Sequence, residues 1–228
     1  MSNRRPLADL IDAIDPGWPV VLNWIAEATN VVELLPSDRP RCDDVLERIQ
    51  VRTRSPMGAI AYESGGLLID HGWVRVLGGG HARLPRDLAR WNYGETWGEE
   101  QRAPGAFLVA DDVLGGFFAI NGGGLSGGSG KVHYFAPDSL EWEDLEQSYS
   151  DFVWFLMVAD LDKFYENRRW PGWQNEVSQL DGDRSYSIAP PLWAKGPPIA
   201  ERSRRPVAVT ELWALQQDIR RQLVSGNT

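Results

Sequence analysis

The residues best able to support catalysis in this sequence are the three histidines, His71, His81 and His133, and the adjacent Asp111 and Asp112. Imidazole nitrogens and carboxylate oxygens bind metal ions and transfer protons near neutral pH. No pair of them has the His-x-x-x-His or Cys-x-x-Cys spacing that is typical of a metal site. We therefore predict no catalytic residue, no metal and no cofactor, and keep a hydrolase or metal-dependent enzyme that uses His71, His81, Asp111 or Asp112 as an alternative.

Two glycine-rich patterns match catalytic motifs only in part. Residues 124–128 have the Gly-x-Ser-x-Gly pattern around Ser126, but a β-rich segment follows where a nucleophile elbow needs a helix. Gly130-Lys131 resembles the end of a phosphate loop, yet Leu125 and Val132 stand where that motif needs glycine and a hydroxyl residue. We interpret residues 122–130 as a flexible hairpin tip.

An acidic segment runs from Asp138 to Asp162 without a Lys or Arg, in a chain of net charge −9. Such a surface attracts a basic partner and speeds its encounter, although a merely solvated face has the same composition. An exposed aromatic residue within it would anchor the partner. The predicted interaction surface comprises Asp138, Glu141, Trp142, Glu143, Asp144 and Glu146.

Tryptophan is the other unusual feature, with eleven in the chain. Trp142, Trp170 and Trp173 have charged neighbours, and clustered aromatic and charged groups form sugar platforms and interface hot spots. Packing in the core is the competing interpretation. A carbohydrate- or small-ligand-binding protein is thus a further alternative.

Bulk properties exclude several classes. The negative charge argues against sequence-independent nucleic-acid binding, which needs clustered cations. The longest apolar run, residues 152–159, is far short of the ~20 residues that span a bilayer, and no apolar leader precedes residue 7. Cys42 is the single cysteine, so no internal disulfide forms. We expect a cytoplasmic protein that binds neither membrane nor nucleic acid; the oligomeric state is open.

The elements expected around these residues are helices flanking consecutive strands. Helical periodicity predicts helices over 16–29 and 42–49, with Asp15 capping the first. Short β-rich segments separated by glycines predict strands at 59–63, 66–70, 73–77, 107–110, 116–121 and 132–135. A short helix or turn is expected at 84–91, and a surface loop at 97–105.

The second half begins with a strong helix signal. Ser148 and Asp151 have the spacing of a capping box, and the following residues are apolar on all sides, as in a helix buried between layers. A further helix is expected from Trp173 to about Leu180, an edge strand at 186–189, and a closing amphipathic helix after Thr210. The fold class is α+β, with a central, mostly antiparallel sheet and flanking helices.

The chain resembles an uncharacterised bacterial family known as a domain of unknown function, number twenty-six twenty-five. The matching stretches are residues 16–19, 53–60, 115–123, 134–138 and 168–173. Together they cover most of the length. The resemblance implies a shared fold and no known activity.

Residues 84–156 are also similar to the SUKH superfamily of Smi/Knr-like proteins, many of whose bacterial members resemble immunity proteins that block toxins. The shared pattern comprises Leu84-Pro85, Gly116-x-Phe118, Val132-x-Tyr134, Asp138, Trp142 and Ser148-Tyr149-x-x-Phe152. The length of 228 residues predicts one domain over 1–228, and the likeness implies a SUKH-like core at about 55–166 with helical extensions at both ends. It also implies a toxin-neutralising role, and together with the acidic segment this predicts a non-enzymatic binding protein with a basic protein partner.

Overall fold

The computed structural model describes residues 4–94 and 105–225 of the chain. All but the last residue of the surface loop expected at 97–105 lie outside these ranges. Within them, no helix is both long and apolar enough to cross a membrane.

The centre of the molecule is a seven-stranded sheet in which every strand pairs antiparallel with the next one along the chain. Glycine-containing turns between short β-rich segments favour such a meander, because sequential antiparallel strands need only short connections. Its strands are β1 (Val32–Pro36), β2 (Ser64–Ile69), β3 (Val74–Leu77), β4 (Ala106–Asp112), β5 (Phe117–Asn121), β6 (Val132–Ala136) and β7 (Glu141–Gln147). The predicted α+β class with a mostly antiparallel sheet is confirmed.

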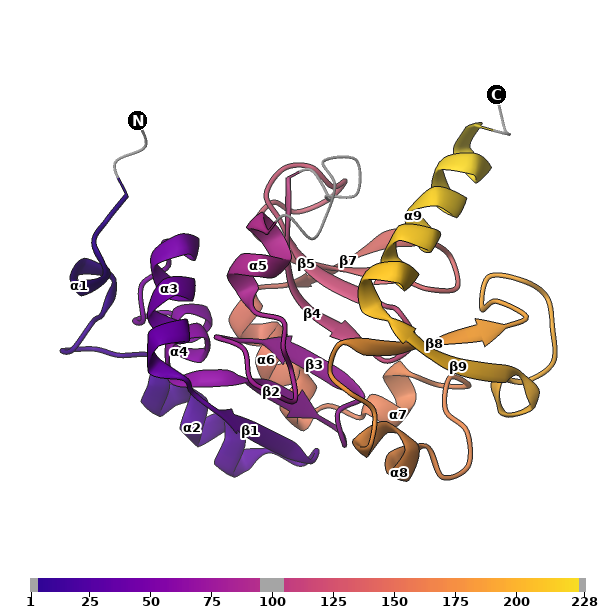
Figure 1. The fold of residues 1–228 in the computed structure, drawn as a ribbon, viewed down its shortest axis with the longest axis horizontal. Coiled ribbons are helices and arrows are strands. Elements are labelled where there is room, and N and C mark those ends of the chain that lie inside the picture. Colours follow the sequence, from indigo (N-terminus) through magenta and orange to yellow (C-terminus); the bar gives the residue numbers. More distant parts are fainter. Residues whose placement is uncertain (1–3, 95–104, 226–228) are drawn as a thin grey trace.

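Nine α-helices occur in the described residues, and they cover both faces of the sheet (Figure 1). On one face, Phe152 of α6 packs on Phe118 of β5, with ring centroids 4.8 Å apart. On its outer side, Trp154 of α6 meets Trp24 of α2. α6 therefore lies between the sheet and α2, as its all-round apolar sequence predicts. The helices are α1 (Leu7–Leu10), α2 (Trp18–Glu27), α3 (Arg39–Ile49), α4 (Pro56–Glu63), α5 (Leu88–Tyr93), α6 (Tyr149–Val158), α7 (Leu161–Phe164), α8 (Trp173–Ser178) and α9 (Val209–Ser225).

The opposite face is covered by α5, α9 and a separate hairpin. Phe117 of β5 contacts Trp91 of α5 and Trp213 of α9. The hairpin consists of β8 (Arg184–Ala189) and β9 (Ser203–Ala208), and the Tyr186 amide donates to the carbonyl of Val113 at 2.7 Å. Figure 1 shows α9 with β8 and β9 at the end of the molecule opposite α1, α2 and α3.

The strand predicted at 59–63 is wrong, because these residues belong to helix α4. Ser55 caps this helix: its hydroxyl accepts a hydrogen bond from the Gly58 amide, and Pro56 follows at the first helical position. Serine before proline is a helix-start signature, and it outweighs the β-rich composition that follows. α2 begins at Trp18 with Gly17, not Asp15, as its N-cap. Strands β1, β7 and β9 have no counterpart among the predicted elements.

The capping box predicted for α6 is present. The Ser148 hydroxyl accepts from the Asp151 amide, and the Asp151 carboxylate accepts from the Ser148 amide. These two side chains accept hydrogen bonds from backbone amides at the start of the helix that would otherwise have no partner. The start of α6 is thus encoded locally.

The glycine loop at 122–130 is tied down by hydrogen bonds, contrary to the flexible tip that its composition suggests. Asn121 Oδ1 accepts from the amides of Gly123 and Leu125. Buried His133 contacts the Ser126 carbonyl through Nε2 at 2.8 Å, and Asp144 Oδ2 accepts from the Gly128 amide at 2.8 Å. Glycine has no side chain that could form hydrogen bonds, so side chains of strands β5, β6 and β7 bind the backbone of the loop instead.

Candidate functional site

Asp111 and Asp112 end strand β4, and both are fully buried. Successive residues of a strand point to opposite faces. Asp111 points toward the hairpin face, where it pairs with the guanidinium groups of Arg75, at 2.6 Å, and Arg86. Both of its carboxylate oxygens are therefore occupied by buried cations.

The two arginines also bind the hairpin region. Arg75 donates to the hydroxyl of Ser185 at 2.8 Å, and Arg86 donates through Nη2 to the Gly182 carbonyl at 2.6 Å. Burial lowers the pKa of Arg75, and the charge of Asp111 opposes that shift. This network holds β8 against the main sheet, a structural task that leaves Asp111 without a free oxygen for catalysis.

Asp112 points to the α6 face. Its Oδ1 accepts from the amides of Leu114 and Gly116, both at 2.8 Å, and shapes the β4–β5 turn. Its Oδ2 accepts from the hydroxyls of Tyr134 at 2.8 Å and Tyr165 at 3.3 Å. Burial raises the pKa of Asp112, while these donors favour its charged form. A side chain at Gly116 would overlap Asp112 and Tyr134, so the turn requires glycine there.

The histidines do not join these aspartates. His71 is exposed and meets Trp173 edge-on, and His81 lies in a β-bridge with Leu84. His133 is enclosed by the glycine loop. Among residues 4–94 and 105–225, no three His, Cys, Asp or Glu side chains come together as metal ligands. The arrangement therefore offers no support for an enzyme that uses His71, His81 and Asp111.

Tyr134 and Tyr165 line a polar cavity of about 160 Å³, which we call the tyrosine pocket. An ion pair between Asp138 and Arg168 and the side chain of Glu143 also line it. The complete lining consists of Leu114, Tyr134, Ala136, Pro137, Asp138, Glu143, Phe164, Tyr165 and Arg168. The pocket thus combines aromatic surfaces with more acidic than basic groups.

Glu143 lies opposite Tyr134 in the β6–β7 register, so both side chains are on the α6 face. Its pKa is raised, first by partial burial and then by the negative charges of Asp138 and Glu141. Arg168 opposes this shift more weakly. The electrostatic environment of the pocket therefore favours an additional positive charge.

The other residues of the predicted interaction surface are distributed around strand β7. Glu141 and Glu146 are exposed, whereas Trp142 is partly buried on the opposite face, where it contacts Phe135 and Trp213. Asp144 is engaged by the glycine loop, and hydrogen bonds from the amides of Gly128 and Glu146 lower its pKa. The structure thus places Asp138 and Glu143 in the lining of one pocket, with Glu141 near enough for its charge to raise the pKa of Glu143, and places Trp142 away from it.

Trp170 and Trp173 are buried around Trp73, with ring centroids 5.6 and 4.9 Å from it. Arg169 stacks on Trp173 at 4.2 Å. Both tryptophans therefore belong to the core and form no exposed sugar platform.

Sequence reasoning missed Phe164, Tyr165 and Arg168 as pocket residues. They follow α6 in the chain, and only the folding of the chain brings them close to Asp138. One signal existed: Asp138 and Arg168 each lie in a stretch that resembles the same family, at 134–138 and 168–173.

These features define an α+β protein with an antiparallel meander covered on both faces and an acidic pocket beside the last strand. The chain belongs to the family described as protein of unknown function DUF2625, whose model matches residues 7–212. It is similar to the putative uncharacterized protein YbfG of Escherichia coli K12, at 43% identity over 95% of this chain and 97% of that protein. An uncharacterized protein of Haemophilus influenzae is 40% identical over 82% of each chain. No solved structure matches. The resemblance to the SUKH superfamily stays a prediction.

Proposed function

We propose that this protein is a non-enzymatic binding protein that captures a basic segment of a partner protein at strand β7 and the tyrosine pocket. The observation that carries the proposal is an acidic pocket beside the terminal strand of the sheet. The two features act together, since a strand edge binds backbone and a pocket selects a side chain.

β7 ends the sheet, so one side of its backbone has no strand partner among the described residues. Proteins protect such an edge from random pairing by placing charges on it. Glu141, Glu143 and Glu146 have this effect, and they also select a partner of opposite charge. A Lys- or Arg-rich extended segment is the chemical complement of this edge.

The tyrosine pocket suits one Lys or Arg side chain of that segment. Glu143 and Asp138 supply negative charge, and the rings of Tyr134 and Phe164, with centroids 5.6 Å apart, supply faces for a cation–π contact. A bound cation relieves the repulsion that raises the pKa of Glu143. Binding is therefore expected to weaken as the pH falls and Glu143 becomes protonated.

Toxin neutralisation in the cytoplasm is the biological role that we propose for this surface. The resemblance of residues 84–156 to immunity proteins supports it, as does the acidic character of the surface. The resemblance and the acidic surface together indicate a basic toxin as the partner.

The test compares two triple variants of equal net charge. Glu141→Lys, Glu143→Lys and Glu146→Lys change the proposed surface, whereas Asp9→Lys, Glu27→Lys and Glu201→Lys change exposed acids elsewhere. Surface plasmon resonance with an immobilised Lys-rich peptide measures association at low and high salt. We expect the first variant to lose at least tenfold in affinity at low salt, with a smaller loss at high salt because salt screens the interaction.

The control variant is expected to bind within about twofold of the wild type. Equal losses in the two variants would show that net charge alone attracts the peptide, and would refute this placement of the site. Partners captured from the host are then tested with the same two variants, and a basic toxin is expected to distinguish them as the peptide does.

A further inference from the structure

One basic side chain of the protein itself already lines the tyrosine pocket. The guanidinium of Arg168 pairs with the carboxylate of Asp138, and Glu143 is the remaining charged residue of the lining. The two paired side chains are 34% and 35% exposed, so solvent reaches both. The pocket therefore contains, within one molecule, the kind of contact that a basic partner would make there.

The backbone that carries Arg168 is held more firmly than its side chain. The Arg168 amide donates to the Tyr165 carbonyl at 2.9 Å, and the next residue, Arg169, stacks on Trp173. Among the described residues, Asp138 is the only hydrogen-bond or ion-pair partner of the Arg168 guanidinium. Exposed ion pairs contribute little to stability because water competes for both groups. The Arg168 side chain can therefore leave Asp138 while its backbone stays in place.

We propose that the basic segment is anchored by an arginine whose guanidinium replaces that of Arg168 at Asp138; this inference rests on the function proposed above. With Arg168 in place, the lining has two carboxylates and one guanidinium. When Arg168 turns to solvent, the two carboxylates of Asp138 and Glu143 face the incoming cation alone, and repulsion between two guanidinium groups is avoided. About 10–15 Å³ of such space holds one water, so the cavity of about 160 Å³ has room for a guanidinium and its stem.

Arginine suits this site better than lysine for two reasons. Its planar guanidinium donates several hydrogen bonds in fixed directions and is less strongly hydrated than an ammonium group, so it pairs well with carboxylates in a pocket. It also stacks on aromatic rings, and Tyr134 and Phe164 supply such rings in the lining. A guanidinium is, moreover, the group that Asp138 binds in the free protein.

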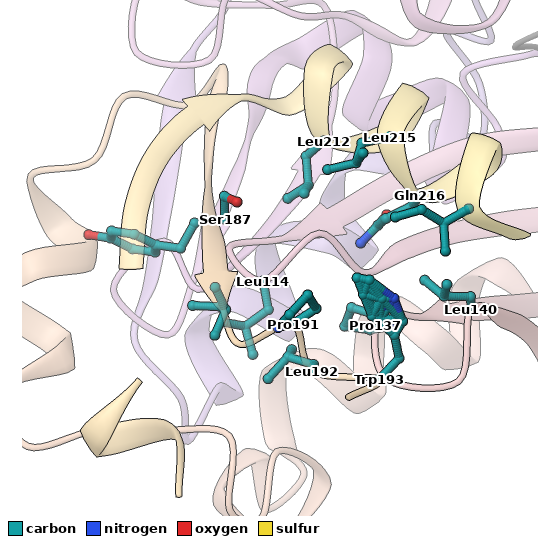
Figure 2. Close-up of a pocket in the computed structure, with 13 residues that line it drawn as sticks. Leu114, Pro137, Leu140, Ser187, Pro191, Leu192, Trp193, Leu212, Leu215 and Gln216 are labelled. Atoms are coloured by element: carbon teal, nitrogen blue, oxygen red, sulfur yellow. The ribbon is translucent and has the colours of Figure 1, made fainter. Parts of the chain in front are cut away.

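A smaller cavity beside the tyrosine pocket lacks this chemistry (Figure 2). Leu114 and Pro137 line both cavities, but the smaller one has a volume of about 60 Å³ and is lined by side chains of α9 and the β8–β9 connection, among them Leu212 and Trp193. None of the described residues in its lining is charged. A guanidinium would lose its hydration there without gaining a counter-charge, so the anchor belongs in the tyrosine pocket.

Two immobilised peptides of equal length and charge, one Arg-rich and one Lys-rich, test the proposal by surface plasmon resonance at low salt. The wild type is expected to bind the Arg-rich peptide at least about threefold tighter than the Lys-rich one. Arg168→Gln is expected to tighten binding of the Arg-rich peptide about three- to tenfold, because Asp138 then lacks its internal partner. Asp138→Asn is expected to weaken it at least about threefold and to reduce the preference for arginine. Opposite signs from the two ends of one ion pair distinguish competition from a structural role, which both substitutions would impair.

The matched control is Arg48→Gln on α3, away from β7 (Figure 1). Arg48 is 30% exposed and pairs with Asp44 at 3.7 Å, so this variant removes the same charge from a pair of similar exposure. Its affinity for the Arg-rich peptide is expected to stay within about twofold of the wild type. NMR adds a direct measure of displacement: the Nε–H signal of Arg168, assigned with Arg168→Gln, is expected to move toward that of a solvent-exposed arginine when the peptide binds.

Three results would overturn the proposal while the acidic binding site itself remains supported. They are unchanged or weaker binding by Arg168→Gln, equal affinity of the wild type for the two peptides, and an Arg168 signal that stays in place when the peptide binds. Absence of binding of either peptide, in both the wild type and Arg168→Gln, would instead refute the function proposed above and this inference with it. The two kinds of failure are therefore distinguishable.

Discussion

Asp111 and Asp112 show how strongly one strand position changes the chemistry of a side chain. The alternation of β4 sends Asp111 to two arginines and Asp112 to two tyrosines. Both carboxylates are buried, yet one is neutralised by cations and the other is surrounded by neutral donors. Residue types alone left catalysis as an alternative for this pair; in the structure, both carboxylates are occupied by buried arginine or tyrosine side chains.

Glu143 is the residue at which pH is expected to matter. Its folded-state pKa lies above the ordinary value of 4.5 because of partial burial and neighbouring acids. A raised folded-state pKa means that stability is greatest below the unfolded-state pKa and falls as pH rises through the folded-state pKa. Glu143→Gln is therefore expected to increase the free energy of unfolding at pH 7, by less than about 1 kcal/mol because the side chain is exposed and screened.

Urea unfolding at pH 7 and again below pH 4.5 measures this effect. The gain is expected to vanish at the lower pH, where wild-type Glu143 is protonated in both states. Glu201→Gln, at an exposed acid remote from the pocket, serves as the control. A gain of the same size at both pH values would contradict the assigned cause.

At the scale of elements, local capping signals mark where helices α4 and α6 begin. Ser55-Pro56 starts α4 although the following residues are β-rich, and Ser148 with Asp151 starts α6. The two helices differ in how readily they are recognised, because α6 is long and apolar while α4 has eight residues, two of them glycine and proline. For these two helices the cap residues mark the start better than composition does, whereas Asp15 does not cap α2.

Ser148→Ala removes half of the capping box and is expected to destabilise the protein by about 1 kcal/mol. Its loss leaves the Asp151 amide without the hydroxyl acceptor. Ser150→Ala, inside the same helix, is expected to change stability by no more than about 0.5 kcal/mol, since alanine is a good helix former. Chemical denaturation of both variants measures the difference; equal effects would argue against a role for the cap.

At the scale of the whole molecule, the buried network around Asp111 joins the hairpin to the main sheet. Arg75 reaches Ser185 of β8, and Arg86 reaches Gly182 just before it. A continuous cluster of buried apolar side chains crosses the same boundary, from Phe117 of β5 to Trp213 of α9. These contacts pack the β8–β9 hairpin and α9 against the main sheet.

Asp111→Asn leaves two buried guanidinium groups without their counter-charge and is expected to cost about 3–5 kcal/mol. The control Asp183→Asn alters an exposed pair with Arg184, 3.9 Å apart, and is expected to cost under about 1 kcal/mol. Tryptophan fluorescence and far-UV circular dichroism are expected to report one common unfolding transition in the wild type. A small loss in Asp111→Asn would show that the network contributes little to holding the hairpin.

The sequence by itself determined the fold class, the central strands from β2 to β6 and the helices α2, α3, α6, α8 and α9, because periodicity, turns and caps act over a few residues. It also indicated where negative charge collects. Tertiary structure decided the surroundings of those charges: it placed Glu143 on the α6 side of β7 and paired Arg168 with Asp138. It also decided that Trp170 and Trp173 are buried. These outcomes depend on contacts between residues far apart in the chain, and no local pattern encodes such contacts.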